Sequence, residues 1–239
     1  MTPLARARTS LLGVSVGDAF GQMVDGFGGE LPRRAAKRLV SMKQPWRWSD
    51  DTAMAISVVD ELAAHGTIDP DRLAVKFAAR FASEPDRGYG AGAYAVLARI
   101  AAGAAWRDEA ARLFRGKGSY GNGAAMRAAP IGAYFAADLE RVRDEALRSA
   151  APTHAHPDGA AGAVAVAVAA AVAHAGGDLL AEAARWTPAS PTRDRIERAR
   201  ELGLDFDVQL AGEELGTGSN ISSRDTVPFA LWVAARHPR

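Results

Sequence analysis

The apolar run from Ala160 to Ala173, made almost entirely of Ala and Val, constrains the fold more than any other stretch. Ala is the strongest helix former, and small side chains let neighbouring helices approach closely. We therefore expect a buried helix at the centre of a helical protein. The run is shorter than the roughly 20 apolar residues that cross a bilayer, so we expect no membrane partner.

Helical spacing of apolar residues recurs along most of the chain. We expect further helices over about 11–21, 50–65, 70–82, 91–102, 106–114, 138–150 and 193–202, and a last one beginning near 224. The segment 185–218 is polar and is expected at the periphery. No stretch alternates Val, Ile and Thr as a strand does, so we predict an all-α fold. A chain of 239 residues is long enough for one core, and we predict a single domain, 1–239.

Glycines recur every fourth residue near the N-terminus, at Gly13, Gly17 and Gly21. They share one helix face, which would allow another backbone to approach closely. Asp18 lies beside this face, either as a polar group that needs a partner or as a surface residue. The stretch 22–32 is rich in Gly and is predicted to be a loop, with Asp25 on a segment that could cover a site.

Ser49, Asp50 and Asp51 stand at the start of an apolar helical run. A Ser before two Asp residues is typical of a helix cap, because the first turn of a helix favours short polar and acidic side chains. The same residues cluster the hard oxygen atoms that a divalent cation such as magnesium or manganese prefers. The stretch by itself is compatible with both interpretations.

A second stretch, 115–127, carries glycines at 116, 118, 121 and 123 and leads into an apolar helix. Such a loop can fold its backbone N–H groups around an anion, but it can equally be a plain linker. It does not match a nucleotide-binding P-loop, because Gly118 follows Lys117 where Ser or Thr would be needed. No predicted strand precedes it, which excludes the dinucleotide-binding fingerprint.

His154 and His156 precede the Ala/Val run. No third nitrogen or sulfur ligand is near them in sequence, so a zinc site is not predicted. We expect His154 to act as a helix cap or as a hydrogen-bonding group beside a ligand.

Charge and composition narrow the partners and the compartment. A formal net charge of +1 gives no electrostatic reason to expect a nucleic-acid partner. The chain has no cysteine, which excludes disulfides and fits a reducing compartment. The basic N-terminus lacks the apolar core of a signal peptide, so we expect a cytoplasmic protein.

Taken together, these stretches resemble the ADP-ribosylglycohydrolase family, which includes the dinitrogenase-reductase-activating glycohydrolase. The matching segments occur in the family's order, at 17–21, 48–52, 118–127, 153–154 and 226–231. The resemblance implies a compact domain of orthogonal helices, with a cleft that holds a binuclear magnesium or manganese centre. It also implies hydrolysis of a glycosidic bond to ADP-ribose, with ADP-ribose or an ADP-ribosylated protein as the partner.

The resemblance also assigns roles to particular residues. Ser49, Asp50 and Asp51 would bind the metal, with Ser49 in a position where the family usually has Thr. Asp50 and Asp51 would act in catalysis together with Asp25, which stands where the family often has Glu. The diphosphate of ADP-ribose would be bound by Ser119, Tyr120, Gly121, Asn122, Gly123 and His154.

One departure from the family bears on the metal centre. The family completes that centre with a Gly-Asp-x-Asp-Thr motif after the Val-Pro-Phe-Ala-Leu helix, and this sequence contains no such motif. We therefore expect a C-terminally truncated member with weakened metal binding, which would also self-associate through uncovered apolar helix faces.

The leading prediction is a metal-dependent hydrolase that removes ADP-ribose. The alternatives are an ADP-ribose-binding protein with an incomplete metal centre, and a purely structural use of the scaffold.

Overall fold

The computed structural model describes residues 1–25 and 45–237, apart from the side chains of residues 24 and 25. Its helices are α1 (Pro3–Asp25), α3 (Asp50–His65), α4 (Pro70–Ser83), α5 (Ala91–Ala101), α6 (Trp106–Gly116), the 3-10 turn η1 (Asn122–Ala124), α7 (Ala129–Tyr134), α8 (Leu139–Ala150), α9 (Pro157–Ala175), α10 (Leu179–Trp186), α11 (Pro191–Leu202), α12 (Val208–Leu215) and α13 (Ser223–Arg236). The described residues form no strand, only one antiparallel bridge between Gly121 and Ser222. The predicted all-α fold is confirmed.

Helix α9 is the central helix, as the Ala/Val run predicts. It contacts α7, α8, α10, α11 and α13, and most of its residues are buried. His156 caps its N-terminus by accepting a hydrogen bond from the Asp158 N–H at 3.1 Å, and Gly176 ends it in the left-handed conformation. The cap is therefore His156, and the prediction that His154 could be the cap is wrong.

The argument that this helix is too short for a membrane does not hold. At 19 residues, α9 is long and apolar enough to cross a bilayer, and it is the one helix of the described residues for which this is true. However, 67% of its most apolar window is buried inside the protein. Such burial is the environment of a core helix, and α9 has this environment because other helices surround it.

Glycines let two helices pack directly against the backbone or first atoms of α9. A Cβ on Gly132 of α7 would overlap the carbonyl oxygen of Ala167. On α9 itself, a Cβ on Gly162 would overlap the hydroxyl of Ser223, at the start of α13. Small residues therefore set the separation of α7, α9 and α13.

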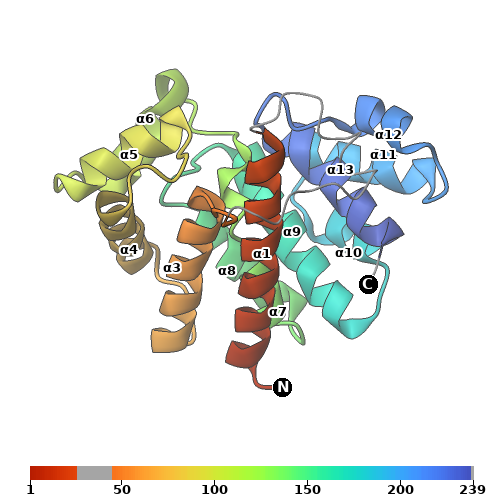
Figure 1. Ribbon diagram of the computed structural model, residues 1–239, viewed down its shortest axis with the longest axis horizontal. Coiled ribbons are helices and arrows are strands. Elements are labelled where there is room, and N and C mark those ends of the chain that lie inside the picture. The colour runs from red at the N-terminus through yellow and green to blue at the C-terminus, as the bar shows by residue number, and fades with distance from the viewer. Residues whose placement is uncertain (26–44, 238–239) are drawn as a thin grey trace.

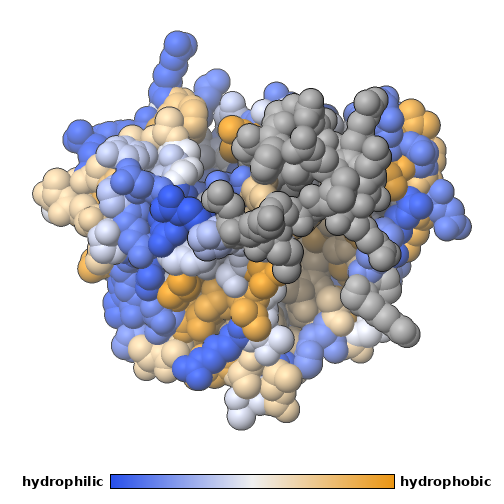
Figure 2. Space-filling model, viewed as in Figure 1, coloured by the Kyte–Doolittle hydropathy of each residue, from blue (hydrophilic) through white to orange (hydrophobic). Residues whose placement is uncertain are grey.

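Helix α1 lies at the front of the molecule, with α3 and α4 on one side and α10 to α13 on the other (Figure 1). Arg6 anchors it to the end of α7, because its guanidinium donates to the carbonyls of Ala133 at 2.8 Å and Tyr134 at 3.0 Å. Hydrophobic residues gather on the surface over α1 and α3 (Figure 2), where Leu12 and Val16 are exposed.

The close approach at the glycine face stays a prediction, whereas the predicted loop start at residue 22 is wrong. A Cβ on Gly13, Gly17 or Gly21 would meet no heavy atom within 4 Å, so no described backbone approaches this glycine face. Residues 22–25, predicted to be loop, continue α1 to Asp25, whereas the rest of the predicted loop lies outside the described residues.

The segment 185–218 is also less peripheral than predicted. Besides the expected helix α11 it contains the end of α10 and all of α12. Thr192, Ile196 and Ala199 of α11 and Leu215 of α12 are fully buried. The high density of Arg and Glu in this segment hides its apolar positions, which recur only once per helical turn.

Candidate active site

Asp18 of α1 caps helix α3 and so fixes the start of the Ser49–Asp51 stretch. One of its carboxylate oxygens accepts hydrogen bonds from the Ser49 N–H at 2.8 Å, the Thr52 N–H at 3.1 Å and the Thr52 hydroxyl at 2.6 Å. The other oxygen accepts from the Ser49 hydroxyl at 2.6 Å. Of the two alternatives for Asp18, the structure therefore supports the polar group with a partner and not the surface residue.

Asp50 and Asp51 occupy the first turn of α3 and are crowded by charge of the same sign. Burial, together with the negative charges of Asp51 and Asp18, raises the pKa of Asp50 to about 7. Burial likewise raises the pKa of Asp51 to about 6, with a contribution from Asp18. The positive charge of Arg127 opposes the shift at Asp50. Carboxyl groups in this pKa range exchange protons near neutral pH, as general bases do.

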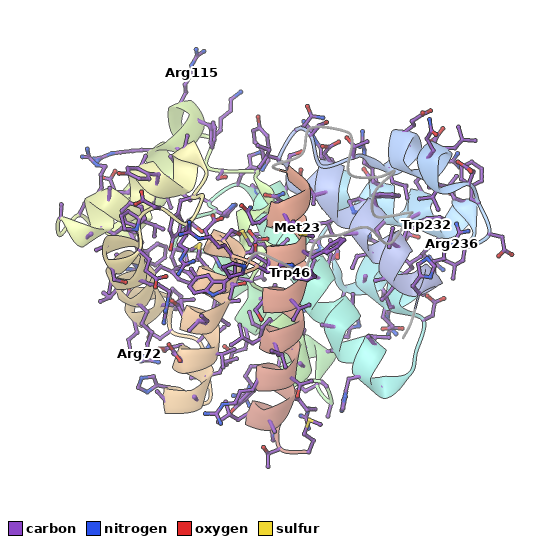
Figure 3. All side chains as sticks on the ribbon, in the orientation of Figure 1. Met23, Trp46, Arg72, Arg115, Trp232 and Arg236 are labelled. Carbon is purple, nitrogen blue, oxygen red and sulfur yellow. The ribbon has the colours of Figure 1, made fainter. Side chains whose placement is uncertain are left out.

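The loop before α5 supports this helix start from the other side. The backbone carbonyl of Arg87 accepts a hydrogen bond from the Asp50 N–H at 2.7 Å. The guanidinium of Arg87 stacks on Trp48, 3.5 Å from the ring centre. Trp46 lies against α1 (Figure 3), 5.8 Å from the ring of Phe20. Trp46 and Trp48 therefore hold the segment before α3 in place, through contacts with Phe20 and Arg87.

The donor set at this helix start fits a divalent cation. Ser49 donates its hydroxyl proton to Asp18 and accepts a hydrogen bond from the Asp51 N–H at 3.3 Å, which leaves one lone pair free. Together with Asp50 and Asp51 it offers the hard oxygens that such an ion prefers. Among the described residues, however, no group of three or more Asp, Glu, His or Cys side chains is placed to hold a metal ion.

The Ser119–Gly123 loop is shaped by the segment that enters α13. The Ser223 N–H donates to the Tyr120 carbonyl at 3.1 Å, and the Ser223 hydroxyl donates to the Gly121 carbonyl at 3.0 Å. Asn122 is bound at both ends, its N–H to the Ile221 carbonyl at 3.3 Å and its side-chain amide to the Thr226 hydroxyl at 3.1 Å.

In these hydrogen bonds the carbonyls of Tyr120 and Gly121 are acceptors, whereas some backbone N–H groups of the loop have no acceptor among the described residues. Within the described part of the chain, the N–H groups of Ser119 and Tyr120 donate to no protein acceptor. The Gly121 N–H is bound by the Ser119 hydroxyl at 3.2 Å. The geometry therefore favours an anion-binding loop over a plain linker, because free N–H groups are what an anion requires.

His154 lies directly against this loop and is buried. A Cβ on Gly123 would come within 3.0 Å of its Cε1 and 3.3 Å of its Nε2, and one on Gly159 within 3.0 Å of its Cδ2. Burial, together with the positive charge of Arg127, lowers the pKa of His154 to about 3. The ring is therefore neutral at physiological pH, and glycines on both sides make room for it.

The exposed face of the loop carries Tyr120. Its ring lies 5.8 Å from Phe114 and 5.7 Å from His156, and the guanidinium of Arg224 lies 5.9 Å above it. Phe114 and Arg115 adopt positive φ angles of 50° and 63°, so the predicted helix loses its regular geometry there. Arg115 points away from the molecule (Figure 3).

Arg127 connects the two predicted stretches, and sequence reasoning gave it no role. It is fully buried, donates to the Gly123 carbonyl at 3.1 Å, and contacts the Met54 sulfur of α3 at 3.6 Å. Arg127 thus joins the Ser119–Gly123 loop to the second turn of α3. Asp25, the third predicted catalytic residue, ends α1, but its side chain lies outside the described part of the structure.

Comparison with known proteins identifies the family of this chain. Human ADP-ribosylhydrolase ARH3 is 42% identical over 120 residues, which cover 49% of this chain and 32% of the human protein. The mouse ARH3 is 34% identical over 217 residues, or 79% of this chain and 57% of the mouse protein. The matches thus span between a third and just over half of these ARH3 proteins. An uncharacterized protein from Archaeoglobus fulgidus is 31% identical over 237 residues, covering 94% of this chain and 75% of that protein. The family profile named ADP-ribosylglycohydrolase matches residues 1–239, and the chain therefore belongs to that family.

Proposed function

We propose that this protein is a metal-dependent hydrolase that removes ADP-ribose from a modified side chain or from a small ADP-ribose derivative. The observation that carries the proposal is that Arg127 contacts both α3, through Met54, and the Ser119–Gly123 loop, through the Gly123 carbonyl. Arg127 thus joins a loop in which the Ser119 and Tyr120 N–H groups donate to no described acceptor to the helix that begins with Asp50 and Asp51, whose pKa values lie near neutrality. The relatives named ADP-ribosylhydrolase support the same reaction class.

The Ser119–Gly123 loop would bind the diphosphate. The free N–H groups of Ser119 and Tyr120 and the buried ring of His154 offer neutral hydrogen-bond donors. Hydrogen bonds to an anion are stronger than those between neutral groups, so a few such donors suffice. The hydrogen bonds to Ser223 and Thr226 fix the conformation of the loop without a ligand, so the loop would be preorganised for binding.

Asp50 and Asp51 would serve the reacting end of the ligand. Ser49, Asp50 and Asp51 would hold a magnesium or manganese ion, which when bound supplies charge to orient the ribose hydroxyls and acidify a water. A carboxylate of this helix start would accept the proton of that water as the glycosidic bond breaks. Asp25 remains a candidate for the same role.

A second candidate is an ADP-ribose-binding protein without turnover. It is favoured by one observation, that the described residues place no third Asp, Glu, His or Cys side chain to hold a metal ion together with Asp50 and Asp51. Binding of the diphosphate requires only the loop and His154, so affinity for ADP-ribose would survive without a complete metal centre.

The test is release of free ADP-ribose from a labelled substrate in the presence of magnesium or manganese. The Asp50→Asn/Asp51→Asn variant should lose this release and keep ADP-ribose binding, measured by calorimetry. Asp205→Asn, which removes an exposed acid from the turn after α11, is the matched control. Release by the double variant at the unchanged rate would contradict the hydrolase mechanism. Binding without release by the native protein would select the second candidate.

A further inference from the structure

We infer that Arg127, acting through the Thr153 hydroxyl, fixes His154 in the tautomer that carries its proton on Nε2, the nitrogen near the Ser119–Gly123 loop. Arg127 and Thr153 are then positioning residues. His154 is the group that would touch a ligand, so the functional consequence rests on the proposed binding of ADP-ribose.

The argument begins with the guanidinium of Arg127, whose terminal donors are all engaged. Nη2 donates to the Ser149 carbonyl at 2.7 Å and to the Thr153 Oγ1 at 2.9 Å. Nη1 donates to the Gly123 carbonyl and contacts the Met54 sulfur. The charge also lies 4.4 Å from the ring centre of Phe77. Arg127 carries no acceptor, so Thr153 Oγ1 must accept in this bond.

The Thr153 hydroxyl therefore keeps its own proton for a second bond. The one acceptor in reach among the described residues is His154 Nδ1, at 2.7 Å from Oγ1. If Nδ1 carried a proton instead, two donors would face Oγ1 and the hydroxyl proton would have no acceptor in a buried place. A buried unpaired donor is costly, so Nδ1 accepts and the ring proton resides on Nε2.

The neutral state of the ring is required for this assignment, because a charged imidazolium would carry protons on both nitrogens. Its burial and the neighbouring Arg127 charge keep it neutral. Carboxyl groups do not offset this: Asp50 acts on Arg127, and the hydrogen bonds of His154 and Thr153 in the described structure involve no carboxylate.

The Nε2 nitrogen faces the loop. A Cβ on Gly121 would lie 3.6 Å from Nε2, and one on Gly123 would lie 3.3 Å from it. No hydrogen bond joins Nε2 to another described residue, although only 6% of His154 is exposed. A fixed N–H donor at this place would face an anionic oxygen, whereas the other tautomer would present a lone pair and repel it.

Nitrogen-15 NMR of the histidine-labelled protein tests the tautomer without any ligand. We expect an unprotonated Nδ1 and a protonated Nε2 for His154, assigned by comparison with His154→Gln. Thr153→Ser, which retains the hydroxyl, should keep this pattern, whereas Thr153→Val should shift both resonances toward a mixture of tautomers. A protonated Nδ1 in the native protein, or a native pattern in Thr153→Val, would overturn the inference.

Calorimetric binding of ADP-ribose and of inorganic pyrophosphate tests the consequence. Thr153→Val should bind both about tenfold more weakly, which is the effect of one hydrogen bond to a charged group, and Thr153→Ser should bind within about twofold of native. Equal loss in both variants would overturn the positioning role. If the native protein binds neither probe, the proposed function fails, and the tautomer is still decided by the NMR pattern.

Discussion

At the scale of single residues, the site depends on side chains that connect elements rather than on those that face a ligand. Asp18 belongs to α1 but caps α3, and Arg127 follows the loop but contacts α3 and the end of α8. Each is a charged side chain that forms several hydrogen bonds within the protein. Replacing either residue is therefore expected to change the stability of the fold and the geometry of the site together.

Asp18→Asn should destabilise the protein by roughly 2 kcal/mol, because an amide has one acceptor oxygen and no charge for the four donors of Ser49 and Thr52. Urea denaturation at neutral pH measures the change. Asp205→Asn, at an exposed turn, is the control and should change the free energy of unfolding by less than about 0.5 kcal/mol. An equally small change for Asp18→Asn would contradict its role as the cap.

The raised pKa values of Asp50 and Asp51 predict a pH dependence of the metal-free protein. Their folded-state pKa values, about 7 and about 6, lie above the ordinary value of 3.8. The folded state therefore binds more protons than the unfolded state across this window. This stabilisation is complete below about pH 4, and it is lost as the pH rises through about 6 to 7.

Asp51→Asn removes one of the negative charges that crowd this helix start. It should raise the free energy of unfolding by roughly 1–2 kcal/mol at about pH 8 and change it little at about pH 4, where both carboxyl groups are protonated. Chemical denaturation in a chelating buffer at both pH values measures the difference. The same gain at both pH values would show that charge repulsion is not its cause.

At the scale of elements, the sequence pattern predicts which segments are helical better than it predicts what they touch. Caps at Ser49, Asp69 and Asp138 are local signals, and the helices that they start were predicted. The glycines of α1 and the glycine of α7 look alike in sequence, but only Gly132 meets another backbone. Contact between helices depends on tertiary placement, which the spacing of one helix does not contain.

Gly132→Ala and Gly13→Ala therefore form a matched pair. The first places a methyl group onto the Ala167 carbonyl and should destabilise by about 3 kcal/mol, as overpacking of a helix contact does. The second meets nothing within 4 Å and should stabilise α1 by about 0.5–1 kcal/mol, because Ala favours the helix. Thermal and urea unfolding compare them. If both variants destabilise alike, the close contact of α7 and α9 is not what Gly132 provides.

The candidate site shows the same division. Ser49 to Asp51 and the Ser119–Gly123 loop were recognisable because their residue types are unusual at a helix start and in a loop. Arg127 and Thr153 fall inside segments that match the family, but their residue types indicate no role, since an Arg after an apolar run and a Thr in a turn are common. Their role emerges only when α7, α8 and the loop come together around His154.

At the scale of the whole molecule, the site is assembled from distant parts of the sequence. Helix α1 caps α3, the central loop carries the free amides, and the segment before α13 holds that loop. The central helix α9 contacts α13 directly, whereas α1 and α3 pack on α7, which in turn packs on α9. Self-association stays a prediction, and the exposed Leu12 and Val16 on α1 are the residues to probe in sedimentation experiments.

Metal binding is a property of this whole assembly, and the incomplete-centre hypothesis makes a definite prediction for it. Ser49, Asp50 and Asp51 supply fewer than the about six oxygens that magnesium or manganese requires, so water must complete the coordination. We expect at most one ion per chain, with a dissociation constant on the order of millimolar. Binding should strengthen as the pH rises above about 7, because protons compete for both carboxylates below that pH.

Titration of the full chain with manganese by calorimetry, at about pH 5 and about pH 8, measures both the stoichiometry and the competition with protons. Asp50→Asn/Asp51→Asn should abolish the heat of binding, whereas Asp205→Asn should leave it unchanged. Tight binding of two ions per chain would contradict the hypothesis. It would mean that ligands beyond this helix start complete the centre, and Asp25 would be the first residue to replace.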